Sequence, residues 1–217
     1  MRISFWETFN SEESFLPFFL PLMAWLTMYF VGRSKGLLFH EWLFMQNLHN
    51  IGCIVLSAIS LYFNDDSIFN ERITILFSLS YFVLDFVDCL IRLDYAYTAH
   101  AFFCLTLGVG NYITPICRIL RTNSKASMVE ISSPFLHMAK TTRKPWHFLL
   151  FVIVFTCCRM IWLPIMMKQL HDGGLPFMQD IRQILMVGFY CLNLFWYYKM
   201  VRIVVTGGRK DSKKKEQ

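Results

Sequence analysis

Five ionisable side chains lie inside otherwise apolar stretches of the sequence, and each comes from a different stretch. They are His49, Asp85, His100, Glu130 and Arg159. An ionisable group at the centre of a membrane helix costs at least about 2.5 kcal/mol, so such a residue is a functional-site candidate by default. Five of them, one from each of five consecutive stretches, favour one lined cavity over five unrelated accidents.

His100 and Asp85 form the candidate catalytic pair. A histidine changes its charge near neutral pH, and His100 can therefore serve as a proton shuttle or as a nucleophile that accepts an acyl group. A carboxylate such as Asp85 would orient the imidazole and stabilise its charged form. Arg159 suits an anionic head group, or it neutralises Glu130. The predicted ligand-binding residues are His49, Asn50, Asp88, Glu130, Arg159 and Asn193.

A purely structural interpretation of the same polar residues stays open. Buried polar groups can pair with one another and hold a helical bundle together. Asp88 and Arg92 stand four residues apart, the spacing of an ordinary ion pair on one helix face. Asp85 is harder to explain in this way, because its surroundings, SYFVLDFV, leave only another helix or water to solvate it.

The elements that position these residues follow from the composition. The chain has 217 residues, of which 55% are hydrophobic and 17% are charged. Soluble domains carry roughly 25% charged residues, so the apolar excess indicates a membrane protein. Backbone polar groups must be satisfied internally in lipid, and the apolar runs show no period-2 alternation, which excludes a β-barrel. We predict an all-α, polytopic transmembrane bundle of about seven spans.

The predicted spans are bounded by short polar loops. A secretory signal would begin with basic residues, whereas the first run follows Glu7, Glu12 and Glu13, so we interpret it as a retained helix. The fifth run is short and contains Glu130 and Pro134, which favours a half-buried or broken helix. The seven runs are Phe15–Gly32, Glu41–Phe63, Arg72–Ile91, Tyr97–Leu120, Ser127–Ala139, His147–Met167 and Ile181–Val205.

The basic C-terminal tail predicts the orientation. From Lys199 to Gln217 the chain holds seven Lys or Arg residues, which places the tail in the cytosol and, with seven spans, the N-terminus in the lumen. The loops RSKG and TTRKP agree, whereas Arg118, Arg121 and Lys125 fall on the opposite side. Six spans, with the fifth run on the cytosolic surface, is the alternative. The predicted regions are 1–40 (lumenal segment and first helix), 41–205 (membrane domain) and 206–217 (basic tail).

The tail also carries a candidate targeting signal. It ends KKEQ, so Lys214 and Lys215 stand fourth and third from the end, as in the dilysine signal by which coat machinery returns membrane proteins to the endoplasmic reticulum. We predict the coat machinery as a partner through these lysines, and no nucleic acid. The seven cysteines all lie in apolar spans, and neither a disulfide framework nor a metal site is predicted.

Four segments together resemble the TLC domain, which the translocating-chain-associating protein, the ceramide synthases and a ceroid-lipofuscinosis membrane protein share. One is a histidine followed by a small polar helix (NLHNIGCIVLS). A second is an aromatic helix with a central Asp, LSYFVLDFVDCLI, 15 residues before the histidine of YTAHAFFCLTLG. The others are Glu-x-Ser-x-Pro-Phe-Leu in VEISSPFLHM and a helix with a buried Arg, TCCRMIWLP. The resemblance covers roughly Glu41 to Val205.

The resemblance implies a six-helix bundle around a lipid-sized cavity, with Phe15–Gly32 added in front, lipid ligands, and residence in the endoplasmic reticulum. Two departures matter. Family members usually carry paired histidines where this chain has His100-Ala101, and the His-Asp-x-x-Asp motif of ceramide synthases is replaced by SMVEISSPFL. We therefore expect a family member that is not a ceramide synthase.

Three functions remain as predictions. The first is a multi-pass protein of lipid homeostasis that binds a membrane lipid or fatty acyl chain in an intramembrane cavity. The second is a membrane-lipid acyltransferase that uses His100 with Asp85; no cofactor motif is evident, and acyl-CoA is the candidate co-substrate. The third is a cargo receptor of the endoplasmic reticulum or a regulatory protein without catalysis. The sequence does not predict the oligomeric state.

Overall fold

The described part of the chain is helical, without a strand. The structure is a computed structural model that describes residues 12–37, 42–175 and 179–206. Its elements are α2 (Glu12–Ser34), α3 (Leu43–Phe63), α4 (Glu71–Ile91), α5 (Tyr95–Ile113), α6 (Pro115–Ile119), α7 (Thr122–Ser127), the 3₁₀ turn η1 (Met128–Ile131), α8 (Ser132–Thr142), α9 (Pro145–Phe155), the π-helical turn η2 (Thr156–Ile161), α10 (Trp162–Asp172) and α11 (Ile181–Thr206).

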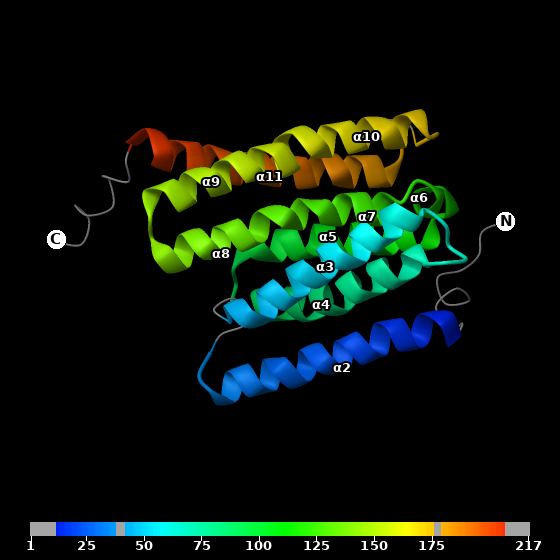
Figure 1. The fold of residues 1–217 in the computed structure, drawn as a ribbon, viewed down its shortest axis with the longest axis horizontal. Coiled ribbons are helices and arrows are strands. Elements are labelled where there is room, and N and C mark those ends of the chain that lie inside the picture. Colours follow the sequence, from blue (N-terminus) through cyan, green and yellow to red (C-terminus); the bar gives the residue numbers. More distant parts are fainter. Residues whose placement is uncertain (1–11, 38–41, 176–178, 207–217) are drawn as a thin grey trace.

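The predicted all-α membrane bundle is confirmed. Five helical segments are long and apolar enough to cross a bilayer: Phe15–Ser34, Leu43–Phe63, Glu71–Ile91, Pro145–Asp172 and Ile181–Thr206. Crossing the hydrocarbon core takes about 20 residues at 1.5 Å per residue. Two further helical runs, α5 and the run from α7 to α8, lie in the same bundle and carry more polar residues (Figure 1).

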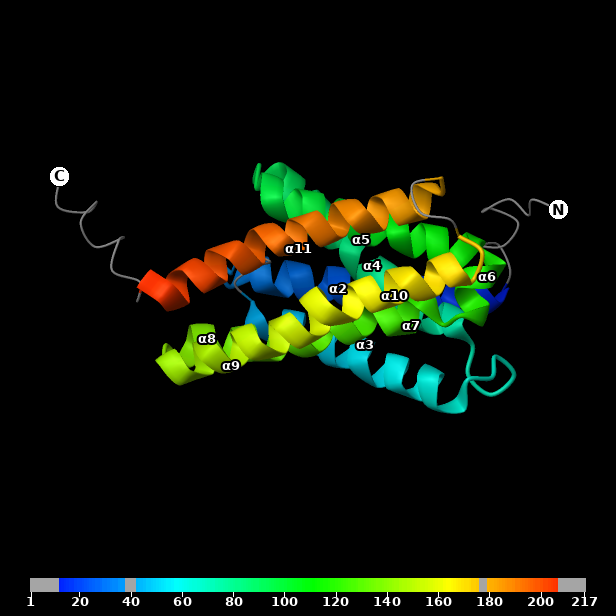
Figure 2. The ribbon, with the colours of Figure 1, turned by 90° about the horizontal axis from the view of Figure 1, so that it is seen from above.

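Successive long runs point in alternating directions, so that the beginning of α2 and the end of α11 lie at opposite ends of the bundle (Figure 1). We call the end at which α11 finishes the tail end, and the other the far end. Seen from above, α5 lies beside α11 and α3 beside α7 (Figure 2). Residues near the start of α3 and α5 and near the end of α4, α8 and α11 therefore share the tail end.

The fourth run ends earlier than the sequence suggested. A single helix over Tyr97–Leu120 was expected, but α5 stops at Ile113 and α6 begins at Pro115. Thr114 has φ −106° and ψ 111°, an extended conformation. The physical reason is the proline ring, which disfavours the helical region for the residue before it.

The fifth run is a broken helix, as its polar residues suggested, but it is longer than Ser127–Ala139. Helical turns continue from Thr122 to Thr142 and change to a 3₁₀ turn at Met128–Ile131. The polar side of this run is buried by its neighbours, since Thr122, Asn123, Ser124 and Ser132 are each buried. The run is therefore an internal element of the bundle.

A buried network closes the far end. Glu71, fully buried at the start of α4, accepts hydrogen bonds from the hydroxyls of Ser60 and Ser124 and from the Ser124 amide at 2.9 Å. Arg121 Nη1 lies 3.7 Å from the Glu71 carboxylate and 2.8 Å from Asp66. We call these five residues the far-end network. Two carboxylates thus neutralise Arg121, one of the basic residues that disagree with the predicted orientation.

Helix α2 packs on the outer side of α4 (Figure 1). Trp25 is buried there, and its indole nitrogen donates to Ser80 Oγ at 3.1 Å. The Tyr29 hydroxyl lies 3.5 Å from Asp88 Oδ1. Helix α2 thus anchors the outer face of α4, while the opposite face of α4 remains available to the interior.

Candidate functional site

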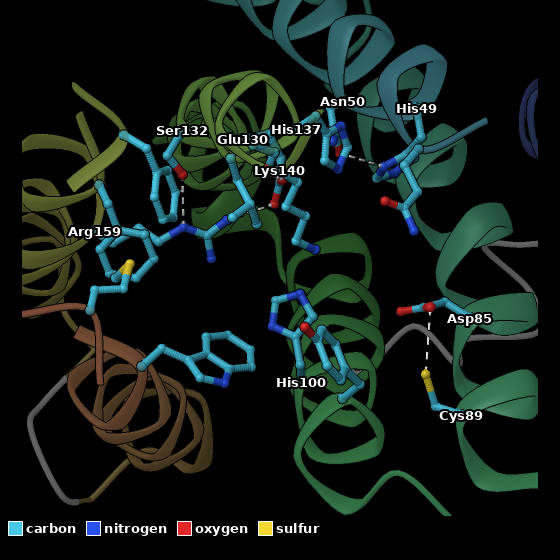
Figure 3. A pocket seen from close by; sticks show the side chains of 18 of the residues that line it. His49, Asn50, Asp85, Cys89, His100, Glu130, Ser132, His137, Lys140 and Arg159 are labelled. Atoms are coloured by element: carbon cyan, nitrogen blue, oxygen red, sulfur yellow. Dashed lines mark hydrogen bonds and ion pairs between the residues drawn. The ribbon is translucent and has the colours of Figure 1, made fainter. Parts of the chain in front are cut away.

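A cavity of about 340 Å³ lies inside the tail-end half of the bundle (Figure 3). Six α-helices and both short turns contribute to its wall: α3, α4, α5, η1, α8, α9, η2 and α11. Its volume is in the range of about 300–1,000 Å³ that is typical of small-molecule sites. The residues that line it include Gln46, His49, Asn50, Tyr81, Phe82, Asp85, Arg92, Tyr97, His100, Glu130, Ser132, Ser133, Leu136, His137, Lys140, Phe148, Phe151, Phe155, Arg159, Trp196, Lys199 and Met200.

Six of the eight predicted site residues border this cavity: His49, Asn50, Asp85, His100, Glu130 and Arg159. The other two do not line it. Asp88 is held by Arg92 at 2.7 Å in the ion pair that the structural interpretation anticipated. Asn193 is fully buried behind Arg159 and accepts a hydrogen bond from Arg159 Nη1 at 3.2 Å. Asn193 therefore positions the arginine without lining the cavity.

Glu130 and Arg159 form the ionic centre of the wall. Arg159 Nη2 lies 3.4 Å from Glu130 Oε1, and Arg159 Nε donates to Ser132 Oγ at 3.1 Å. The Ser133 hydroxyl donates to Glu130 at 2.7 Å. The guanidinium also lies over the Phe155 ring, 5.4 Å from its centroid. Each charge is thus compensated, yet both border open space, so a polar ligand group can compete for them.

A π-helical turn, η2, carries Arg159 on the long helical run from α9 to α10. A π turn holds one more residue than an α turn, and such turns are frequent at functional sites. The inserted residue changes the direction of the side chains that follow it. Here the turn puts Arg159 on the cavity wall although the sequence around it, TCCRMI, shows no helical stripe of polar residues.

His100 has an unused nitrogen. Its Nε2 lies 3.7 Å from Cys104 Sγ, whereas its Nδ1 is buried and has no hydrogen-bond partner within the described residues. The ring stacks on Phe189 with centroids 5.5 Å apart and tilts against Trp196 at 5.3 Å. A buried nitrogen without a partner is costly, so it is poised to meet a polar group that enters the cavity.

Asp85 faces His100 across the open space (Figure 3). Its recorded hydrogen bond comes from Cys89 Sγ at 3.6 Å on its own helix. Over the described ranges no hydrogen bond joins Asp85 to His100. We expected the two residues to face one cavity and to be coupled directly or through a water, and of these two couplings the direct one is not formed. The two groups are close enough to share one cavity, and a ligand or water would have to bridge them.

His49 is more enclosed than His100. Its ring stacks on Tyr81 with centroids 3.8 Å apart, and both ring nitrogens have neighbours, Asn50 at 3.2 Å and Cys53 at 3.3 Å. A histidine with both nitrogens engaged and 1% exposure is a wall residue with little freedom to react. Between His49 and His100, the geometry therefore favours His100 for any chemistry.

The apolar part of the wall comes from α8, α9 and α11. Phe148, Phe151 and Phe155 repeat at spacings of three and four along α9, so their rings share one helix face. Leu136 and Met200 complete this surface. The cavity thus joins a hydrocarbon surface to an ionic centre, which is the combination that an amphiphilic molecule requires.

Sequence reasoning missed part of the α8 contribution. Ser133, His137 and Lys140 line the cavity together with Glu130. Their spacings of three, four and three residues place them on one helical face, a signal that the sequence did contain. It was overlooked because His137 and Lys140 stand close to a loop. His137 Nδ1 also contacts Asn47 Oδ1 at 2.5 Å, which ties α8 to α3.

Comparison with known proteins agrees with this architecture. A family model described as the TLC domain matches residues 37–202, which span α3 to α11 and exclude α2. The searches of curated proteins and of solved structures gave no match. The match covers well over half of the chain and includes every residue that lines the cavity. This integral, multi-pass membrane protein belongs to the TLC domain family.

Proposed function

We propose that the protein acts in lipid homeostasis by binding a membrane lipid or a fatty acyl chain in the tail-end cavity. One observation carries this proposal: a single space of about 340 Å³ is bordered both by the ionic pair of Glu130 with Arg159 and by the phenylalanine face of α9. The polar part of an amphiphile would lie beside the pair. Its chain would lie against Phe148, Phe151 and Phe155.

Filling the apolar wall tests the proposal. Leu136 lines the cavity, so Leu136→Trp should place an indole where the chain would lie. Leu149 on α9 is 49% exposed on the outer surface, so Leu149→Trp is a matched control. Native mass spectrometry of the purified protein should show lipid adducts on the wild type and on Leu149→Trp, and few on Leu136→Trp. Equal adducts on both tryptophan variants would contradict binding in this cavity.

An acyltransferase is the second candidate, and the unpartnered Nδ1 of His100 favours it. In this reaction His100 would act as base or nucleophile toward an acyl thioester such as acyl-CoA. Asp85 would stabilise the charged imidazole only after a ligand or water bridges the two groups. An acyl adduct on His100 in the mass spectrum supports this reaction, and a reversibly bound lipid supports binding without turnover.

Paired substitutions separate catalysis from binding. If His100 and Asp85 act as a unit, His100→Ala and Asp85→Asn should each abolish the effect of the protein on cellular lipids. The double variant should then be no worse than either single variant, because residues that act together are not additive. Lipidomics of cells that express each variant at matched abundance measures this. Full activity of both single variants would remove the catalytic candidate.

We further propose residence in the endoplasmic reticulum through the terminal KKEQ. Lys214 and Lys215 lie outside the described residues, so this proposal is supported by the sequence of the tail. It is the feature that keeps a cargo receptor or a regulatory protein among the candidates. Changing both lysines to serine should let a tagged protein move toward the Golgi or the cell surface. Unchanged localisation would make the motif incidental.

A further inference from the structure

Two lysines stand at the tail-end margin of the cavity. Lys140 lies near the end of α8 and Lys199 near the end of α11, and both line the cavity. Figure 3 shows the Lys140 side chain extending into the open space between Arg159 and Asp85. Because α8 and α11 finish at the same end of the bundle, the two lysines line the cavity from its tail end.

The other cations of the wall already have acidic partners. Arg159 pairs with Glu130 at 3.4 Å, and Arg92 pairs with Asp88 at 2.7 Å. Neither lysine has a hydrogen bond or an ion pair to any residue between positions 12 and 206 that the structure describes. The Lys199 ammonium lies over the Phe195 ring, 4.1 Å from its centroid.

The resulting charge balance points to an anionic ligand. Apart from the two ion pairs, the charged groups of the wall are the ammonium groups of the two lysines and one carboxylate, that of Asp85. The Asp85 carboxylate accepts a hydrogen bond from the Cys89 thiol. A concave site with a surplus of one sign of charge concentrates ligands of the opposite sign. Two separate lysines suit a group with several negative oxygens, such as phosphate, since each ammonium can donate to a different oxygen.

We propose that Lys140 and Lys199 form a phosphate-binding site at the mouth of the cavity. The inference rests on the proposed function and narrows it: the bound amphiphile carries a phosphate at the membrane surface, its linkage lies near Glu130 and Arg159, and its chain lies along the α9 phenylalanines. The phosphate belongs either to a membrane phospholipid or to the coenzyme A part of an acyl thioester. Both sources present the same oxygens to the lysines.

The test compares probes that differ in the phosphate and its source. Native mass spectrometry of the full chain would measure the binding of dioleoyl phosphatidic acid, oleoyl-CoA and dioleoylglycerol, which has no phosphate. We expect one or both phosphate carriers to bind at least tenfold more tightly than dioleoylglycerol. Stronger binding of phosphatidic acid identifies a membrane lipid, and stronger binding of oleoyl-CoA identifies the thioester.

Charge-removing variants locate the site. A basic residue near an anionic lipid surface contributes about 1 kcal/mol, so Lys140→Gln and Lys199→Gln should each weaken binding of the preferred phosphate carrier about fivefold. Lys144 is exposed at the same end but does not line the cavity, so Lys144→Gln is the matched control and should change nothing. Lys140→Arg keeps the charge and should retain binding.

Each outcome is decisive. If none of the three probes binds the wild type, the proposed function fails and this inference fails with it. If dioleoylglycerol binds as tightly as the phosphate carriers, or Lys144→Gln weakens binding as much as Lys140→Gln, lipid binding stands and the phosphate site is overturned. Should a lysine variant not fold, wild-type binding measured from 0.05 to 0.5 M salt decides, because binding to exposed lysines must weaken as salt screens them (screening length about 10 Å at 0.1 M).

Discussion

Two buried glutamate–arginine pairs occupy opposite halves of the same bundle, and they differ in what surrounds them. Glu71 and Arg121, 3.7 Å apart at the far end, are enclosed by serine hydroxyls, a backbone amide and Asp66. Glu130 and Arg159, 3.4 Å apart, border a cavity with an unpartnered histidine nitrogen. The same pair of residue types is therefore fully enclosed in one half and borders open space in the other, and only the second arrangement leaves room for the ligand that we propose.

The far-end pair should dominate stability. Removing one partner of a buried ion pair typically costs about 3–5 kcal/mol, because the other charge is left without compensation. Glu71→Ala leaves Asp66, which is partly exposed, as the carboxylate partner of Arg121 and opens a hole beside Ser60 and Ser124, so we expect a large fall in melting temperature in detergent. Glu130→Ala should cost less, since Arg159 keeps other partners and can reach water through the cavity. An equal fall in melting temperature for both variants would show that the two ion pairs stabilise the fold equally.

Ligand binding should depend on the residues of the cavity and not on those of the far-end network. A ligand present at about 100 times its dissociation constant stabilises the folded state by about 2.7 kcal/mol. The preferred lipid should therefore raise the melting temperature of the wild type. Glu71→Gln should start from a lower melting temperature and show the same rise, because the network lies outside the cavity. If Glu71→Gln abolished the rise, the two halves would be coupled.

The smallest expected effect concerns acid stability at the far end. The hydrogen bond from Arg182 holds the pKa of Asp180 below its ordinary value, and Arg182 also donates to Thr114 at 2.5 Å. Since the pKa of Asp180 is lower in the folded state than in the unfolded state, the pair stabilises the protein above pH 4. That contribution is lost as the pH falls through the folded pKa.

Thermal unfolding at several pH values checks this. Between pH 5 and pH 3, the melting temperature of the wild type should fall slightly as the ion pair is lost. Asp180→Asn lacks the pair at every pH, so it should already melt lower and should not show this fall. Lys168 and Asp172 form an exposed pair at the same end, so Asp172→Asn is a control with little expected effect. Identical acid profiles for the wild type and Asp180→Asn would show that the Asp180 pair adds nothing.

The sequence predicted the cavity half of the molecule better than the far half. An ionisable residue within a long apolar run, such as Asp85 or Arg159, is conspicuous because few explanations accommodate it. Glu71 gave no such signal, since it closes the acidic segment NDDSIFNE and reads as a loop residue. Its burial depends on α7 folding back against α4, which is a tertiary contact that local pattern does not encode.

The local sequence also does not determine the distances between the predicted site residues. His100 and Asp85 were expected to face one cavity and to be coupled directly or through a water, and they do line one cavity without a direct hydrogen bond. The distance between the two side chains depends on how α4 and α5 pack, and the spacing of residues along the chain does not report the angle between two helices. The helix break before Pro115 is the opposite case. A proline alone is sufficient to predict that a helix ends before it, but this proline stands within an apolar run and its effect was overlooked.

The π-helical turn divides the longest helical run into two parts, and the side chains of one part are out of register with those of the other around the helix axis. Upstream of Thr156, the phenylalanines of α9 face the cavity; downstream of Ile161, Leu163, Met166 and Met167 of α10 pack in the far half. If the same residues formed a regular α-helix, the side chains after the turn would be rotated by about 100° relative to those before it. The extra residue thus lets one continuous helix present one face to the cavity and an independent face to the packed far half of the bundle.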